Sequence, residues 1–305
     1  MTTSNENPDV LIIGAGATGA AVAWSLSRAG ISVMCLDQGD WVSSSDYHLD
    51  EPDWELSRWS DFHAAPNHRG LKSDYPITDG ESAIAPLMYN AVGGSTIHWG
   101  AHFPRFHPSD FKVRSLDGVA EDFPYSYEDL VPFFDLNERM MGVSGFDGDP
   151  FYAVKSPRPM PPLALGKLGE TIAGGFDKLG WHWWPADAAI ASIPYGEGRG
   201  ACNYGSSCDL GCMTGAKAST DITYWPQALQ AGAQLITNAR VRELVVGDDG
   251  RLKSAIYYRN GQLFEQKAQI IIVACNGIGT PRLLLNSISH QFPNGLANNL
   301  SLIHI

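Results

Sequence analysis

The stretch that decides the fold of this chain is residues 9–19, DVLIIGAGATG. The apolar run predicts a short buried strand, and the glycines after it predict a tight turn into a helix over residues 20–29, which Gly30 would end. A second apolar strand over residues 31–36 would end at Asp37. This order of strand, glycine turn, helix and strand is typical of a dinucleotide-binding α/β unit.

The glycines of this stretch have separate roles in such a unit. Gly14 allows the tight turn, Gly16 lets the backbone approach a pyrophosphate, and Gly19 lets helix and strand pack closely. Ala17 lies at the helix start, where free N–H groups attract phosphates. Asp37 lies 18 residues after Gly19, where a carboxylate can accept both ribose hydroxyls. The motif alone does not separate FAD from NAD.

Composition excludes several classes of protein. The chain has 305 residues, of which 44% are hydrophobic and 18% charged, and these are globular values. A net charge of −12 argues against binding to nucleic acid or to anionic lipid. No apolar run reaches the roughly 18 residues of a membrane span. Residues 1–8 lack the pattern of a signal peptide, which favours a cytoplasmic location unless a signal-bearing partner exports the protein.

A second glycine-rich stretch spans residues 90–101. Gly93 and Gly94 would let the backbone lie against a flat or charged ligand, and Ser95 can donate to a phosphate or a ring atom. The alternative is a plain turn before a helix. Residues 38–89, between the two glycine stretches, are polar and aromatic and predict long loops with short helices. Such long loops are usually functional.

The middle of the chain predicts two helices and a tryptophan-rich segment. One helix covers residues 131–141, with its start signalled from Ser126. An amphipathic helix follows, which we expect to pack in the core; its apolar stripe is Leu165, Leu168, Ile172, Phe176 and Leu179. Trp181, Trp183 and Trp184 then lie in a strand-like segment. They could wall a sugar or polyol site, but the pattern favours simple burial.

The last third predicts a helix over residues 220–230 and then a run of short strands. Turn residues separate strands at 234–237, 241–246, 252–258 and 262–268, which suggests a small antiparallel meander. A buried strand over residues 270–274 leads into a further glycine turn and a helix over residues 277–287. The sequence therefore predicts an α/β fold.

The five cysteines divide into two kinds. Cys35 and Cys275 are expected to be small buried apolar residues. Cys202, Cys208 and Cys212 have the spacing C-x5-C-x3-C, and three thiols on one loop cannot pair evenly as disulfides. This spacing favours an iron–sulfur cluster. Zinc is a weaker alternative because no fourth ligand is obvious, and free or disulfide-bonded cysteines are the remaining one.

Four stretches together resemble the glucose–methanol–choline (GMC) family of FAD-dependent oxidoreductases, most of all the flavoprotein subunits of bacterial gluconate and glucose dehydrogenases. They are residues 14–19 with Asp37, residues 93–96, the segment around Val241, and residues 274–284. The resemblance implies a Rossmann-like FAD-binding domain, with Val241 bonding adenine through its backbone. It also implies that the turn from Ala274 to Gly277 closes over the pyrophosphate.

The resemblance leaves the role of His98 open. The histidine–tryptophan pair after the second glycine stretch is similar to that of family members whose histidine is bonded covalently to the flavin. A neutral imidazole nitrogen is the nucleophile that such a link needs. A non-covalent flavin contact and an ordinary loop histidine are the alternatives. For Cys202, Cys208 and Cys212 the resemblance implies a 3Fe–4S cluster.

The activity implied by the resemblance is oxidation of CH–OH groups of a sugar, a sugar acid or another alcohol. Hydride would pass to flavin N5, and electrons would leave to an acceptor other than NAD. The expected partners are the small-molecule substrate, a small subunit and a cytochrome c. An oxidase that uses oxygen is one alternative, and a catalytically incompetent FAD-binding fragment is another.

The resemblance also implies a division into domains. Residues 1–110 and 197–305 would form a discontinuous FAD-binding domain, and residues 111–196 part of a substrate or cap domain. The histidine base of the family is expected beyond residue 305, so we expect a truncated chain with no catalytic base. The last five residues depart from the family pattern, and His304 among them is not assigned as the base.

Overall fold

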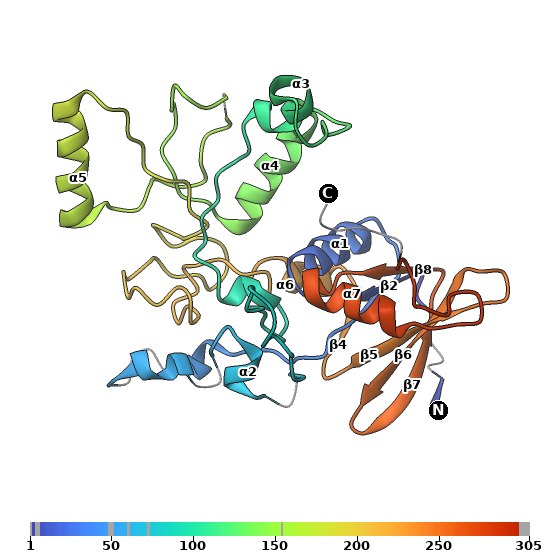
Figure 1. Ribbon diagram of the computed structural model, residues 1–305. Helices are drawn as coiled ribbons and strands as arrows, with labels where there is room; N and C mark the ends of the chain where they lie inside the picture. The colour runs from blue at the N-terminus through green and yellow to red at the C-terminus, as the bar shows by residue number, and fades with distance from the viewer. Residues whose placement is uncertain are drawn as a thin grey trace. The chain divides into compact units, whose positions relative to one another are not determined.

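A computed structural model describes residues 2–3, 7–47, 52–59, 62–71, 74–153 and 155–298, so the final residues with His304 lie outside the described part. The chain forms two compact units (Figure 1). Unit 1 consists of Met1–Trp99, Asp209–Gly211 and Ser219–Leu300, and unit 2 of Gly100–Cys208 and Cys212–Ala218. Unit 1 falls within the two segments predicted for the FAD-binding domain, whose exact division stays a prediction.

Unit 1 is organised around a parallel sheet with the strand order β4–β3–β2–β8. The strands are β2 (Val10–Ile13), β3 (Val33–Leu36), β4 (Gln234–Ile236) and β8 (Ile270–Val273). Every residue of β2 and β3 is buried, as expected of strands in a parallel sheet that is covered on both faces. β8 pairs along the whole of β2, with Val10 opposite Ile270, so a segment from late in the chain completes the sheet.

The helix after the first glycine turn is α1 (Ala17–Arg28), which confirms the predicted turn and helix. Gly30 follows it in the left-handed conformation, with φ of 78°, as a residue just past a helix end often is. α1 packs against α6 (Tyr224–Gln230). The Trp225 indole N–H donates to the carbonyl of Ala15 at 2.8 Å, so α6 supports the glycine turn from behind.

A second sheet of unit 1 has the order β1–β7–β6–β5. Its strands are β1 (Thr2–Thr3), β5 (Arg240–Val246), β6 (Leu252–Arg259) and β7 (Gln262–Lys267). β5, β6 and β7 are antiparallel neighbours, which confirms the predicted meander. Asn260 and Gly261 join β6 to β7 with positive φ at both residues, as a two-residue hairpin turn requires. The pairing of β1 with β7 was not predicted.

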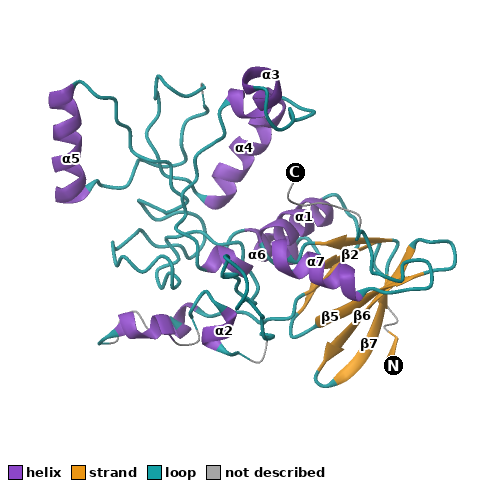
Figure 2. Ribbon diagram, in the orientation of Figure 1, coloured by secondary structure: helices purple, strands orange, loops and turns teal. Residues whose placement is uncertain are grey.

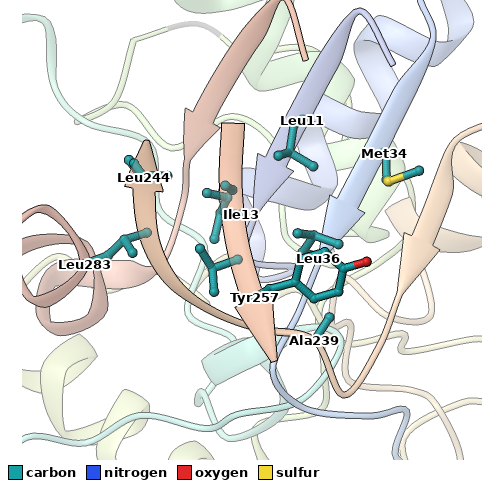
Figure 3. Packing of buried hydrophobic residues seen from close by; sticks show 10 residues of the cluster. Leu11, Ile13, Met34, Leu36, Ala239, Leu244, Tyr257 and Leu283 are labelled. Carbon is teal, nitrogen blue, oxygen red and sulfur yellow. The ribbon is translucent and has the colours of Figure 1, made fainter. Parts of the chain in front are cut away.

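The main core of unit 1 lies between its two sheets (Figure 3). Leu11 and Ile13 of β2 meet Leu244 of β5 and Tyr257 of β6 in one apolar cluster. α7 (Asn276–Asn286) lies against β5 and adds Leu283, which is 3% exposed. This packing fixes the carboxyl ends of β2, β3 and β8 relative to the first turn of α7.

Unit 2 is built mostly of loops (Figure 2). Its helices are α3 (Val113–Asp117), α4 (Tyr127–Met141) and α5 (Gly166–Leu179), and its described residues contain only isolated β-bridges instead of strands. α4 confirms the predicted helix, because Ser126 caps its N-terminus and exchanges hydrogen bonds with Asp129. Unit 2 also contains a 3-10 turn at Pro108–Lys112. The short helices of unit 1 are α2 (Pro66–Arg69) and 3-10 turns at Ser44–Asp46, Trp54–Trp59 and Gly94–Ile97.

A buried ion-pair network ties the loops of unit 2 to α4. Glu138 is only 2% exposed and accepts hydrogen bonds from Arg105 at 2.6 Å and from Arg158 at 2.9 Å. Arg158 also binds Asp187 through two nitrogens, at 2.9 and 2.8 Å. Arg158 therefore links the Pro-rich segment after residue 155 both to α4 and to the segment around residue 187.

Two expectations for unit 2 are wrong. The stripe of α5 was expected in the core, but Leu168 is 75% exposed and Leu179 62% exposed. Trp181 is 60% exposed, and residues 181–184 form no strand. A helical repeat of apolar residues specifies an apolar face, but it does not specify whether the same unit covers that face. No helix of the described part is both long enough and apolar enough to cross a membrane.

Candidate functional site: a cofactor cavity in unit 1

The first glycine turn is sterically fixed at two of its three glycines. A Cβ at Gly14 would lie 2.5 Å from the carbonyl oxygen of Ala274, and Gly14 also has φ of 104°. A Cβ at Gly19 would overlap the carbonyl oxygen of Gly14, much closer than van der Waals contact allows, so no side chain fits there. Gly16 instead has open space beside it. The turn therefore leaves room for a ligand at the one glycine where a pyrophosphate was predicted to approach.

Asp37 follows the end of β3 and is only 8% exposed. Its Oδ2 accepts a hydrogen bond from the N–H of Ala15 at 2.7 Å, and its Oδ1 accepts one from the N–H of Gly39 at 2.8 Å. Burial raises the pKa of Asp37 to about 6, although the two N–H donors act in the opposite direction. The carboxylate is thus held beside the glycine turn with its orientation fixed by backbone groups.

The second glycine stretch contacts the first one. The N–H of Gly93 donates to the carbonyl of Ala15 at 3.0 Å, and a Cβ at Gly94 would lie 3.0 Å from the Cα of Gly16. Gly94–Ile97 forms a 3-10 turn, in which Thr96 donates from its hydroxyl to the Gly93 carbonyl at 2.6 Å. The two glycine stretches therefore make adjoining parts of one backbone surface.

His98 ends this 3-10 turn. Its Nδ1 lies 2.8 Å from the carbonyl oxygen of Asp209. A carbonyl only accepts, so Nδ1 carries the proton, and in the neutral ring the lone pair then belongs to Nε2. The Tyr89 ring meets the His98 ring edge-on, with 4.1 Å between centroids. Ring orientation and tautomer are both set by neighbours within unit 1.

These segments enclose a cavity of about 240 Å³ at the carboxyl ends of β2 and β3. Eight of the predicted cofactor residues line it: Gly14, Gly16, Ala17, Asp37, Gly94, Ser95, Val241 and Ala274. Four do not: Gly19, Gly93, His98 and Gly277. Gly19 and Gly93 shape the turns behind the wall. Gly277 follows Asn276, which does line the cavity at the start of α7.

The cavity also has lining residues that the sequence analysis missed. Tyr75 and Arg282 both line it and contact each other, with the guanidinium carbon of Arg282 lying 4.2 Å from the centroid of the Tyr75 ring. Asn90 and Gln38 are joined by a 2.7 Å hydrogen bond. Asn90 also donates to Asp74 at 2.6 Å. Only Asn90 carried a local signal, because it is the first residue of the second glycine-rich stretch; the others meet through tertiary contacts alone.

The cysteines of unit 2 do not gather into a metal site. None of the five cysteines, all of which lie in the described part of the chain, is in a disulfide, so the disulfide alternative is not realised. Among the described residues no group of three histidine, cysteine or acidic side chains could hold a metal ion, and this includes Cys202, Cys208 and Cys212. In unit 1, Cys35 is fully buried as expected, whereas Cys275 is partly exposed and lines the cavity. Burial raises the pKa of Cys275 to about 12, so its thiol is protonated.

Comparisons with known proteins agree with this architecture. Residues 9–48 match the family model of FAD-dependent oxidoreductases, and residues 171–304 match that of GMC oxidoreductases. The fold and the glycine-turn site thus match those of the FAD-dependent oxidoreductase class. Within that class the chain belongs to the GMC family, as the resemblance had indicated.

Curated relatives match nearly the whole chain. A 2-methyl-1,2-propanediol dehydrogenase of Mycolicibacterium austroafricanum is 41% identical over 99% of this chain and 55% of its own length. The large subunit of a fructose dehydrogenase of Gluconobacter japonicus is 31% identical over 99% of this chain and 58% of its own. The chain spans somewhat over half the length of these relatives.

Among solved structures, a pyridoxine 4-oxidase from Mesorbium loti matches with a TM-score of 0.59 and 18% identity, over 92% of this chain and 52% of its own. A formate oxidase matches with a TM-score of 0.54 and 13% identity, over 94% of this chain and 48% of its own. At such identities the likeness shows the fold alone.

Proposed function

We propose that this chain is the FAD-binding part of an oxidoreductase that oxidises CH–OH groups of a sugar, a sugar acid or another alcohol. The observation that carries the proposal is the cavity of unit 1, where open space beside Gly16 adjoins the oriented carboxylate of Asp37. Two curated relatives are named as dehydrogenases of a diol and of fructose, which supports alcohols as the substrate class. FAD, when bound, would supply the two-electron oxidation.

The cavity residues suit the separate parts of FAD. The N–H groups at the start of α1 and the glycine surface of Gly16 and Gly94 suit a pyrophosphate. Asp37 suits the adenosine ribose. Its carboxylate already accepts hydrogen bonds from two backbone N–H groups and can accept further ones from the ribose hydroxyls. Val241 lines the same cavity, where its backbone would bond adenine.

Flavin binding tests this proposal directly. The purified chain is titrated with FAD, and the quenching of flavin fluorescence gives the dissociation constant. Asp37→Asn should weaken binding about tenfold or more, because an amide cannot accept two hydroxyls as a carboxylate does. Asp40→Asn is the matched control, since Asp40 is an exposed acid of the same segment that does not line the cavity. Equal affinities of both variants and the unaltered chain would refute the site.

A covalent link between His98 and the flavin is a finer part of the proposal. The hydrogen bond from Nδ1 to the Asp209 carbonyl leaves Nε2 as the nucleophilic nitrogen of the neutral ring, so Nε2 is the atom expected to bond the flavin. Flavin absorbance that stays with acid-precipitated protein, and is lost in His98→Ala, would support the link. Flavin that is released completely from the unaltered chain would refute it.

Electron acceptor, cluster and compartment are proposed at the level of the whole protein. We propose a small subunit as a partner, because one relative is named as the large subunit of its enzyme, and a cytochrome c as the electron acceptor that the family resemblance implies. Cys202, Cys208 and Cys212 are proposed as cluster ligands only in a rearranged loop, and no electron path is drawn through them. Analysis of the unaltered protein for iron and acid-labile sulfide tests that assignment, and the Cys208→Ser variant should lose both. The proposed compartment is the cytoplasm, or the periplasm if a signal-bearing partner exports the complex.

A specific observation also favours the oxygen-using alternative. Relatives at 30% identity include a paromamine 6'-oxidase of Streptomyces fradiae and a 6'''-hydroxyparomomycin C oxidase of Streptomyces lividus. Peroxide formation under air by the whole protein separates the two functions. Stoichiometric peroxide would identify an oxidase, whereas turnover only with an added electron acceptor would identify a dehydrogenase.

A further inference from the structure

Unit 2 contains a cavity of about 550 Å³ that shares no lining residue with the cofactor cavity of unit 1. One wall is formed by the lining residues between Phe146 and Ala153 together with Lys155, and the other runs from Trp184 to Asp187. The indole N–H of Trp184 donates to the carbonyl of Phe146 at 2.9 Å, so the two walls are joined at one end. The volume is typical of a site for a small molecule.

Aromatic rings form one part of the lining. Phe146 and Trp184 lie with 5.1 Å between ring centroids, and Tyr152 lines the same cavity. The ammonium of Lys155 lies 3.9 Å from the centroid of the Tyr152 ring. Aromatic faces offer flat apolar surface while tolerating polar groups at their edges, which suits a ring that carries C–H bonds on one face and hydroxyls at its rim.

Charged groups form the other part of the lining. Both cations are already paired, because Arg158 binds Asp187 through two nitrogens and Lys155 binds it at 2.9 Å. Asp147 and Asp149 add two more carboxylates to the wall. Asp147 accepts from the Arg158 backbone N–H at 3.0 Å, and Asp149 accepts from the Phe151 N–H at the same distance.

The charge balance of this lining discriminates among ligands. Counting the aspartate, lysine and arginine side chains alone, three aspartates against one lysine and one arginine give the lining a formal charge of −1. An anionic ligand would face these carboxylates, and both Lys155 and Arg158 are already paired with Asp187. Hydroxyl groups, in contrast, donate well to carboxylate oxygens. An entirely apolar ligand would leave these carboxylates desolvated at a cost.

We propose that this cavity binds a neutral polyhydroxylated ligand, a sugar or sugar alcohol, and disfavours sugar acids. The aromatic pair of Phe146 and Trp184 would contact the C–H face of the ligand. Asp147 and Asp149 would accept hydrogen bonds from its hydroxyl groups. The inference rests on the proposed function for its substrate class and narrows that class to uncharged polyols.

Equilibrium binding tests the site without turnover. The chain is titrated with D-glucose, D-fructose and glycerol, and separately with D-gluconate, by calorimetry and saturation-transfer NMR. At least one neutral polyol should bind saturably, and gluconate should bind about tenfold more weakly than glucose because of its charge. Trp184→Ala should weaken the neutral polyols about tenfold. Trp181→Ala is the matched control, since Trp181 is exposed and does not line the cavity.

A charge variant gives an independent result if Trp184→Ala fails to fold. Replacing Asp147 and Asp149 together by asparagine should keep the cavity shape and bring the affinities for gluconate and glucose to within about threefold. Absence of saturable binding by any neutral polyol, or equal loss in the Trp181 and Trp184 variants, would overturn the site. FAD affinity is measured on the same samples, so failure of the polyol site with intact FAD binding leaves the proposed function standing.

Discussion

The two units of this protein specify their structures in different ways. Unit 1 relies on backbone contacts: a Cβ at Gly19 would collide with the carbonyl of Gly14, and Gly93 donates to the carbonyl of Ala15. Unit 2 relies on side-chain charges, with Glu138 holding Arg105 and Arg158 among long loops. Backbone constraints leave a signature in the sequence, because only glycine satisfies them, whereas an ion-pair network leaves none.

The largest expected effect breaks unit 1. Gly19→Val should lower the free energy of unfolding of unit 1 by more than about 4 kcal/mol, because its side chain meets backbone that cannot move aside. Denaturant unfolding followed by circular dichroism measures the change. Gly16→Ala is the control, since the space beside Gly16 is open; it should keep the stability within about 1 kcal/mol while weakening FAD binding.

The next effect breaks unit 2. Glu138→Ala leaves two buried guanidinium groups without their shared carboxylate and should destabilise unit 2 by about 3 kcal/mol. Hydrogen exchange read separately over the two units measures it, with protection lost around α4 and retained in β2 and β3. Glu128→Ala, an exposed acid of the same helix, should change little. Loss of protection in both units to the same extent would contradict the separate origin of their stability.

A third expected effect concerns the ionisation of Asp37 in unit 1. With a pKa of about 6, Asp37 is largely protonated at pH 5 and ionised at pH 7. Ribose hydroxyls stabilise the ionised form, so FAD affinity should rise about tenfold from pH 5 to pH 7. The folded pKa exceeds that of the unfolded chain, so the cofactor-free protein should lose stability as pH rises from about 4 to 6. Affinity that stays constant with pH, or that varies equally in Asp37→Asn, would rule out this role.

The smallest expected effect concerns α5. Leu168→Glu should change the free energy of unfolding by less than about 0.5 kcal/mol, because Leu168 is 75% exposed. Leu283→Ala is the contrasting variant, since Leu283 is buried in the core of unit 1 and should cost about 2 to 3 kcal/mol. Both values come from the same denaturant titrations. A cost at Leu168 as large as that at Leu283 would restore the expected core role of α5.

The sequence predicted unit 1 well for physical reasons that the structure makes visible. Steric demands at Gly14 and Gly19 and the buried runs of β2 and β3 are local, so pattern analysis finds them. The sequence did not identify Tyr75 and Arg282 as cavity residues, because these two residues come together only when the chain folds. The α5 stripe and Trp181 were predicted to be buried but are exposed, because the periodicity of apolar residues does not show which faces are covered.

The late arrival of β8 has a consequence for how this protein is made on the ribosome. Val10 pairs with Ile270, so β2 emerges about 260 residues before β8, one of its two neighbours in the sheet. At a synthesis rate of about 5 to 20 residues per second, β2 waits roughly 13 to 52 seconds with one edge unpaired. An apolar strand in that condition is prone to pair with other chains. Slower translation or a shortage of chaperones should therefore reduce the yield of folded protein through unit 1 rather than unit 2.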